Sequence, residues 1–143
     1  MRHFIISSHS HLAEGMVSAL ELIVGKIDNL SFYNAYTEEE TGDNEHFKEK
    51  IMREINSIPK EEDIIIMTDM FGGSVNNELL ELCKIKNCHL VTGMNLLLVI
   101  GLCLGSEKEP INEQIHRLVE EAKTGIIYCN ELNSDSEFEN EEF

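Results

Sequence analysis

Basic residues are scarce in this chain. Its 143 residues include 11 Lys and Arg against 27 Asp and Glu, which gives a formal net charge of −16 at pH 7. A surface of this sign repels nucleic acid and anionic membranes, so we expect neither as a direct partner. A basic protein would instead be attracted to it.

Long apolar runs are also missing. The strongest run, Leu96–Leu104, contains Gly101 and is about half as long as the roughly 20 residues that a membrane-spanning helix needs. The segment Met1–Ile6 carries one positive charge and is followed by polar Ser7, so it is too short for the apolar part of a secretion signal. We therefore expect a cytoplasmic protein, and the length and the 42% apolar content fit a single domain.

The short motifs that hold metal clusters and nucleotides are lacking as well. There is no C-x-x-C pair, no G-x-x-x-x-G-K-[ST] loop, and no glycine-rich turn after the first apolar run. We expect no cofactor. The cysteines lie among apolar residues, which favours buried free thiols over a disulfide framework or a zinc site and agrees with a reducing compartment. These cysteines are Cys83, Cys88, Cys103 and Cys129.

Strand-like and helix-like patterns alternate along the first 129 residues, which we take as one domain. Short apolar runs without helical period predict strands at 4–8, 30–33, 63–68, 89–93 and 125–128. Apolar residues at steps of three and four predict helices at 12–24, 47–58, 74–82, 95–104 and 111–123. This alternation predicts an α/β fold, with a doubly wound, mainly parallel sheet and helices on both of its faces.

The carboxyl-terminal segment has a different composition. Residues 130–143 include six acidic residues and no basic one, with few side chains able to form a core. This composition predicts a disordered, solvated tail. A tail that binds a partner is the alternative.

Two polar segments follow predicted strands that can be neighbours. One is Ser7–His11 and the other is Asp69–Ser74, and in an open parallel sheet ligands bind at the carboxyl ends of the strands. A neutral imidazole attacks phosphorus well at pH 7, so His9 is the candidate nucleophile and phosphate carrier. A carboxylate that accepts the proton of the other ring nitrogen would orient the imidazole and stabilise its cation, and Asp69 is the candidate for that role.

The same segments contain candidate ligands for the phosphoryl group. Gly72, Gly73 and Ser74 offer backbone N–H groups, a hydroxyl and the positive end of a helix. Ser8 and Ser10 offer further hydroxyl donors. Each signal alone is weak, because a histidine after a strand usually packs or caps and Gly-Gly-Ser is usually a tight turn. Their combination at two strand ends favours a functional site.

A metal site is the competing interpretation of the first segment. His9, His11 and Asp69 could in principle supply three ligands from adjacent loops. A two-residue offset in a loop does not direct both rings at one centre, however, and no supporting partner is visible in the sequence. We therefore expect no metal, and expect His11 to shape the mouth of the site.

The sequence resembles the IIA domains of mannose-type sugar phosphotransferase systems, also called the mannose/fructose/sorbose family. Three segments carry the resemblance: Phe4–Gly15, Ile66–Ser74 and Gly93–Leu96. The resemblance implies that His9 is phosphorylated, with Asp69 and Ser74 in supporting roles. It also implies a doubly wound parallel sheet whose last strand, here 125–128, is antiparallel and exchanged between the subunits of a homodimer, which would remove an exposed sheet edge.

Partners follow from the same resemblance. It implies phosphorylation by the phosphocarrier protein HPr and transfer to a IIB domain, which phosphorylates a sugar that enters through the membrane subunits IIC and IID. Two positions depart from the family pattern, since Val75 stands where Pro is common and Ser10 where Gly is common. Neither departure removes a reacting group, but Ser10 restricts the backbone of its loop.

Two other functions remain open from the sequence. The phosphoryl-donor subunit of a dihydroxyacetone kinase resembles the same family and would use the same histidine with a different acceptor. A non-catalytic module that is switched by phosphorylation of His9 is the second alternative. Asp69 and Ser74 disfavour the switch, because a switch needs no site adapted to rapid onward transfer.

Overall fold

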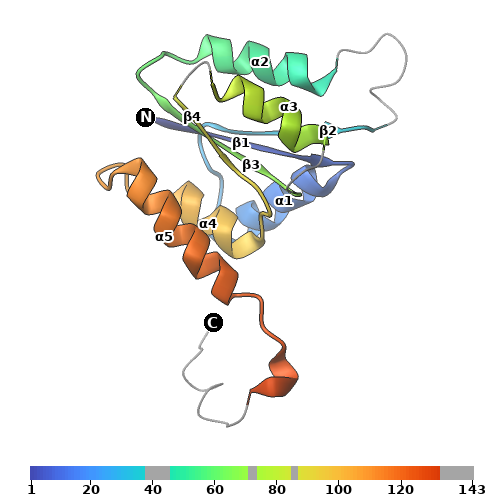
Figure 1. The fold of residues 1–143 in the computed structure, drawn as a ribbon, viewed down its shortest axis with the longest axis vertical. Coiled ribbons are helices and arrows are strands. Elements are labelled where there is room, and N and C mark those ends of the chain that lie inside the picture. Colours follow the sequence, from blue (N-terminus) through green and yellow to red (C-terminus); the bar gives the residue numbers. More distant parts are fainter. Residues whose placement is uncertain (38–45, 71–73, 85–86, 133–143) are drawn as a thin grey trace.

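The computed structural model describes residues 1–37, 46–70, 74–84 and 87–132. Its centre is a parallel four-stranded sheet with the strand order β2-β1-β3-β4 (Figure 1). The strands are β1 (Arg2–His9), β2 (Leu30–Ala35), β3 (Asp63–Thr68) and β4 (Cys88–Val91). β2 lies on one side of β1 and β3 lies on the other. The direction in which successive strands are added therefore reverses between β1 and β3, and ligands bind at such a point in open α/β sheets.

Helices cover both faces of the sheet, as predicted. In Figure 1, α2 and α3 lie above the sheet, and α1, α4 and α5 lie below it. Their bounds are α1 (Leu12–Val24), α2 (Phe47–Ser57), α3 (Ser74–Leu82), α4 (Leu96–Leu104) and α5 (Ile111–Thr124). Local signals set several ends: Gly25 ends α1 at φ 86°, and the Asn95 side chain caps α4 by accepting from the N–H of Leu98.

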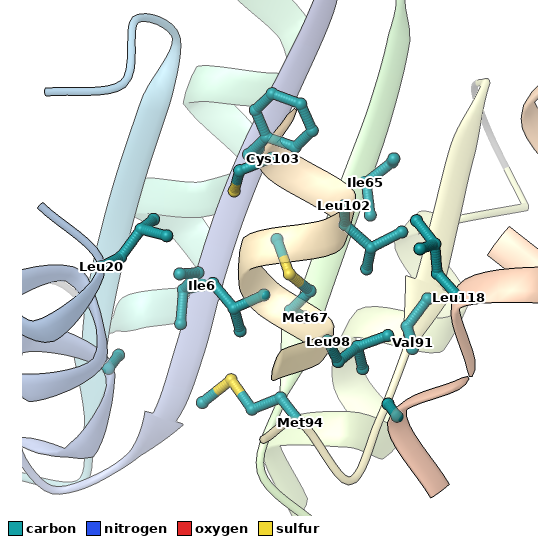
Figure 2. Packing of buried hydrophobic residues seen from close by; sticks show 14 residues of the cluster. Ile6, Leu20, Ile65, Met67, Val91, Met94, Leu98, Leu102, Cys103 and Leu118 are labelled. Carbon is teal, nitrogen blue, oxygen red and sulfur yellow. The ribbon is translucent and has the colours of Figure 1, made fainter. Parts of the chain in front are cut away.

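The alternation of side chains along the central strands builds one core on each face. Phe4 and Ile6 of β1 pack towards α1, α4 and α5, and Figure 2 shows Ile6 with Met67 and Leu102 in that cluster. Ile5 packs towards α2 and α3 with Phe47. A strand that is buried on both faces has a continuous apolar sequence, which explains the unbroken run in β3. Two packed faces leave the carboxyl ends of β1 and β3 in a fixed relative position.

The predicted last strand is wrong for the single chain. Residues 125–128 form no strand; they follow α5 and lead into a short 3-10 helix, η2 (Cys129–Glu131). Ile126 is 79% exposed and Tyr128 is 66% exposed. A strand needs a neighbour that accepts and donates its backbone hydrogen bonds, and within the described residues the sheet ends at β4. An antiparallel or exchanged strand is therefore not part of this structure.

Three smaller predictions can be compared with the structure. The four cysteines form no disulfide, but Cys129 is exposed on η2, so the prediction of burial is wrong for that residue. Among the four, only Cys103 is buried.

The predicted tail, 130–143, lies outside the described residues except at its start, where Asn130 and Glu131 belong to η2. In the described part of the chain, every helix is too short or too polar to cross a bilayer.

Candidate functional site

His9 and Asp69 meet at the carboxyl end of the sheet. His9 is the last residue of β1, and Asp69 directly follows β3, the strand beside it. The backbone N–H of His9 donates a 3.0 Å hydrogen bond to Asp69 Oδ2, and the ring atom Nδ1 lies 3.0 Å from the same oxygen. A carboxylate only accepts hydrogen bonds, so Nδ1 holds the proton in this pair and the lone pair lies on Nε2.

Exposure differs between the two side chains. The His9 side chain is 40% exposed, whereas that of Asp69 is 11% exposed. Partial burial by itself raises the pKa of Asp69, but the hydrogen bonds from the His9 backbone and ring, together with the charge of the ring, outweigh it and lower the pKa overall. The N–H of Met70 donates a further 3.0 Å hydrogen bond to Oδ1. Asp69 is therefore an anion at neutral pH that orients an accessible imidazole.

Ser10 and Ser8 shape the turn after His9. Ser10 is exposed and has φ 52°, the left-handed region that glycine adopts freely, and its N–H donates a 2.8 Å hydrogen bond to the Ala35 carbonyl. Ser8 is fully buried; its Oγ accepts from the N–H of Ala13 at 2.6 Å and donates to the His9 carbonyl at 3.1 Å. Of the roles that the sequence leaves open for Ser8, the structure favours capping over binding of the phosphoryl group, because its buried hydroxyl holds the turn.

The predicted phosphoryl-binding turn is only partly described. Gly72 and Gly73 lie outside the described residues, and of Ser74 the structure describes only that α3 begins there. The start of α3 is fixed by a buried hydrogen bond of 2.9 Å, which the Thr68 hydroxyl donates to Asn76 Oδ1. The beginning of α3 is thus tied to the strand that ends beside Asp69.

Tyr36 belongs to the site and was not predicted. Its ring centroid lies 5.7 Å from that of His9 with an angle of 31° between the ring planes. Tyr36 directly follows β2, which pairs with β1 so that Ala35 lies opposite His9. The rule that selected His9 and Asp69, a residue at the carboxyl end of a neighbouring strand, also selects Tyr36 once the strand order is known.

His11 contacts side chains other than those of His9 and Asp69. Its Nδ1 lies 3.2 Å from Asn34 Nδ2 and 3.8 Å from a Glu14 carboxylate oxygen. His11 is therefore bound to the first turn of α1 and to β2. Across the described ranges, no three His, Cys, Asp or Glu side chains are grouped so as to hold a metal ion.

Comparisons with known proteins identify similar chains. Residues 3–119 match the family model EIIA-man, described as the PTS system fructose IIA component. A solved structure assigned to a phosphoenolpyruvate-dependent sugar phosphotransferase system permease from Klebsiella pneumoniae is 33% identical, with a TM-score of 0.81, and the match covers 91% of this chain and 92% of that one.

More distant structures share the fold. The PTS IIA protein associated with the fucose utilization operon of Streptococcus pneumoniae is 25% identical, with a TM-score of 0.72 over 92% of this chain and 96% of that one. The mannose/sorbose-specific IIA subunit from Enterococcus faecalis is 18% identical, with a TM-score of 0.75 over 88% of this chain and 92% of that one. The curated proteins compared with the chain include no match.

Proposed function

The chain belongs to the EIIA-man family of the phosphotransferase system, and from this premise we propose that it carries a phosphoryl group on His9 from phospho-HPr to a IIB domain. A component of this family is a phosphotransfer protein of sugar transport. The acceptor would phosphorylate a sugar imported through IIC and IID, so this chain would contact the membrane subunits only indirectly. We place the carrier domain at residues 1–129, the acidic tail at 130–143, and the protein in the cytoplasm.

The geometry of His9 and Asp69 carries the proposal. In the forward step, Nε2 of His9 attacks the phosphorus atom of phospho-HPr, a bond from Nε2 to phosphorus forms, and the bond from phosphorus to the donor breaks. The ring then holds the proton on Nδ1 and the phosphoryl group on Nε2, and the Asp69 carboxylate stabilises the positive charge that develops on it. In the transfer to the IIB domain, a nucleophile of that domain forms a bond to phosphorus and the bond from phosphorus to Nε2 breaks. The imidazole of His9 is then neutral again, with its proton on Nδ1.

The phosphoryl group needs donors of its own. We propose that the backbone N–H groups of Gly72 and Gly73, the Ser74 hydroxyl and the exposed Ser10 hydroxyl bind its oxygens, helped by the positive end of α3. Ser10 is one residue from His9, and α3 begins five residues after Asp69.

Exposed apolar side chains beside His9 support a protein as donor and acceptor. Leu12 and Met70 are 51% and 59% exposed. Each lies close to the reacting pair in the chain: Leu12 begins α1 after the His9 turn, and Met70 follows Asp69. Large apolar groups that rim an accessible nucleophile suit contact with another protein surface better than binding of a small polar sugar.

We further propose that the chain forms a homodimer through residues 125–128. Ile126, Ile127 and Tyr128 expose apolar side chains next to one another, and β4 is an edge strand of the sheet that the described residues form. Pairing of this segment with the sheet of a second copy would cover both features and close the interface by twofold symmetry.

Phosphorylation in a reconstituted system tests the function. Incubation with phosphoenolpyruvate, the system's enzyme I and HPr should place one acid-labile phosphate on the chain, and the label should be absent from His9→Ala but present on His11→Ala. Equal labelling of His9→Ala would refute the assignment. Phosphorylated protein is then offered a IIB domain or the nucleotide-binding subunit of a dihydroxyacetone kinase. Transfer to the kinase subunit alone, or binding to a regulator without transfer, would replace the proposed acceptor.

A further inference from the structure

Tyr36 adopts a backbone conformation that is unfavourable for its side chain. Its φ is 58°, in the left-handed region, where the Cβ of a bulky residue crowds the backbone. Among the described non-glycine residues, only Ser10 and Asn29 share this feature, and asparagine tolerates it. A strained residue of this kind persists only where the surrounding structure imposes it.

The strain at Tyr36 is coupled to the turn that follows His9. His9 and Ala35 are the last paired residues of β1 and β2, and the next residue on each strand, Ser10 and Tyr36, is left-handed. The N–H of Ser10 donates to the Ala35 carbonyl at 2.8 Å, which fixes the two turns relative to each other. The chain therefore turns sharply on both strands at the level of the reactive histidine.

These turns place the Tyr36 ring between the α2 core and the His9 ring. Its centroid lies 5.5 Å from that of Phe47, edge to face at 70°, and Phe47 is 1% exposed. It also lies 6.2 Å from the ring of His46, the N-cap of α2, whose capping box holds it in place. The ring of Tyr36 is thus supported on one side by fixed aromatic residues while it contacts the imidazole of His9.

From this arrangement we propose that Tyr36 is a positioning residue for phosphoryl transfer, whose ring restrains the His9 imidazole in the orientation that presents Nε2 to the donor. The inference rests on the proposed function of His9. Asp69 fixes the direction of Nδ1, but the second side-chain torsion of histidine is intrinsically broad, so one hydrogen bond leaves the plane of the ring free to tilt. Packing of Tyr36 against the imidazole supplies the second restraint.

Two substitutions separate the ring from the rest of the residue. Tyr36→Phe retains the ring, whereas Tyr36→Asn removes it and inserts a side chain that tolerates positive φ, so the turn is preserved. Tyr36→Gly is a second ring-deleted variant with no steric conflict at this φ. Phe32→Thr is the matched control, because Phe32 is a 40% exposed ring on β2 and Thr suits a strand.

The measurements are the maximal rate of His9 phosphorylation, the concentration of phospho-HPr that gives half that rate, and thermal unfolding. We expect Tyr36→Asn to lower the maximal rate by about tenfold to a hundredfold, because a misplacement of about 1 Å can have an effect of that size. The half-saturating concentration should change by less than about twofold, and Tyr36→Phe and Phe32→Thr should resemble the wild type.

Several results would overturn the inference. A wild-type maximal rate in folded Tyr36→Asn or Tyr36→Gly would show that the ring is dispensable. A change confined to the half-saturating concentration would make Tyr36 a docking residue, and equal losses in Tyr36→Phe and Tyr36→Asn would assign the effect to the hydroxyl. If wild-type protein is not labelled on His9 at all, the proposed function fails first. Labelling of the wild type with no effect at Tyr36 refutes this inference alone.

Discussion

The hydroxyl of Thr68 donates a hydrogen bond of 2.9 Å to Asn76 Oδ1 in the interior of the protein. Thr68 ends β3 immediately before Asp69, Asn76 lies in the first turn of α3, and both side chains are buried. The bond therefore spans the segment that contains the candidate phosphoryl-binding residues and fixes where α3 begins relative to Asp69.

Thr68→Val should destabilise the protein by about 1–3 kcal/mol, because Asn76 Oδ1 would lose its donor in a buried environment. Urea unfolding at neutral pH measures the difference. Thr92→Val is the matched control: Thr92 Oγ1 is buried and has no hydrogen-bond partner among the described residues, so the same substitution there should be neutral or stabilising. Equal losses in the two variants would show that the bond between Thr68 and Asn76 adds no stability.

Ser8→Ala should cost about 1–2 kcal/mol, because it leaves the buried N–H of Ala13 without its acceptor at the start of α1. The measurement is the midpoint and slope of urea unfolding. Ser18→Ala provides the comparison, since Ser18 is exposed on the same helix and alanine is the better helix former there. If Ser8→Ala is no less stable than Ser18→Ala, the Ser8 hydroxyl does not hold the turn.

Most of the fold and part of the site could be predicted from the sequence. The β-branched apolar run in β3 is typical of a strand that is buried on both faces, and the three- and four-residue steps are typical of helices. An alternating chain of this kind forms a parallel sheet. Because the carboxyl ends of parallel strands lie at one edge of a sheet, the same pattern predicts that His9 and Asp69 lie close together. Both predictions depend on local pattern and on topology, and neither requires side-chain detail.

Other features depend on contacts that local pattern does not encode. Residues 125–128 have the composition of a strand, but a strand also needs a paired neighbour, and in the single chain this segment pairs with none of the four strands of the described sheet. Ser8 resembles a surface donor in sequence, yet the start of α1 folds over it. Tyr36 could be linked to His9 only through the register of β1 and β2 and the left-handed turns that follow them.

The proposed dimer predicts that Ile126→Asp dissociates it. A charge on a residue that is buried between two copies loses its hydration, so we expect the dissociation constant to rise by at least about tenfold. Analytical ultracentrifugation over a concentration series measures it. Leu22→Asp is the control, because Leu22 is 88% exposed on α1, away from residues 125–128 in sequence. A monomeric wild type, or a dimer that Ile126→Asp leaves intact, would refute this interface.

Asp69→Asn tests the carboxylate that holds His9. The amide of asparagine can donate to Nδ1, which would shift the ring proton to Nε2 and remove the lone pair that attacks phosphorus. We expect His9 phosphorylation to slow by about a hundredfold or more, since the equivalent exchange in a serine protease costs roughly 10⁴-fold. Asp63→Asn, at the opposite end of β3, should leave the rate unchanged.

The same variant gives a stability test with a defined sign. The pKa of Asp69 is lowered in the folded protein, whereas the pKa of an unfolded aspartate is about 3.9. The ionised carboxylate therefore contributes stability that is fully present above about pH 4 and is lost as the pH falls through the folded value. The wild type should exceed Asp69→Asn in free energy of unfolding at pH 7, and the difference should shrink towards pH 3. A difference that stays constant or grows on acidification would contradict a lowered pKa at Asp69.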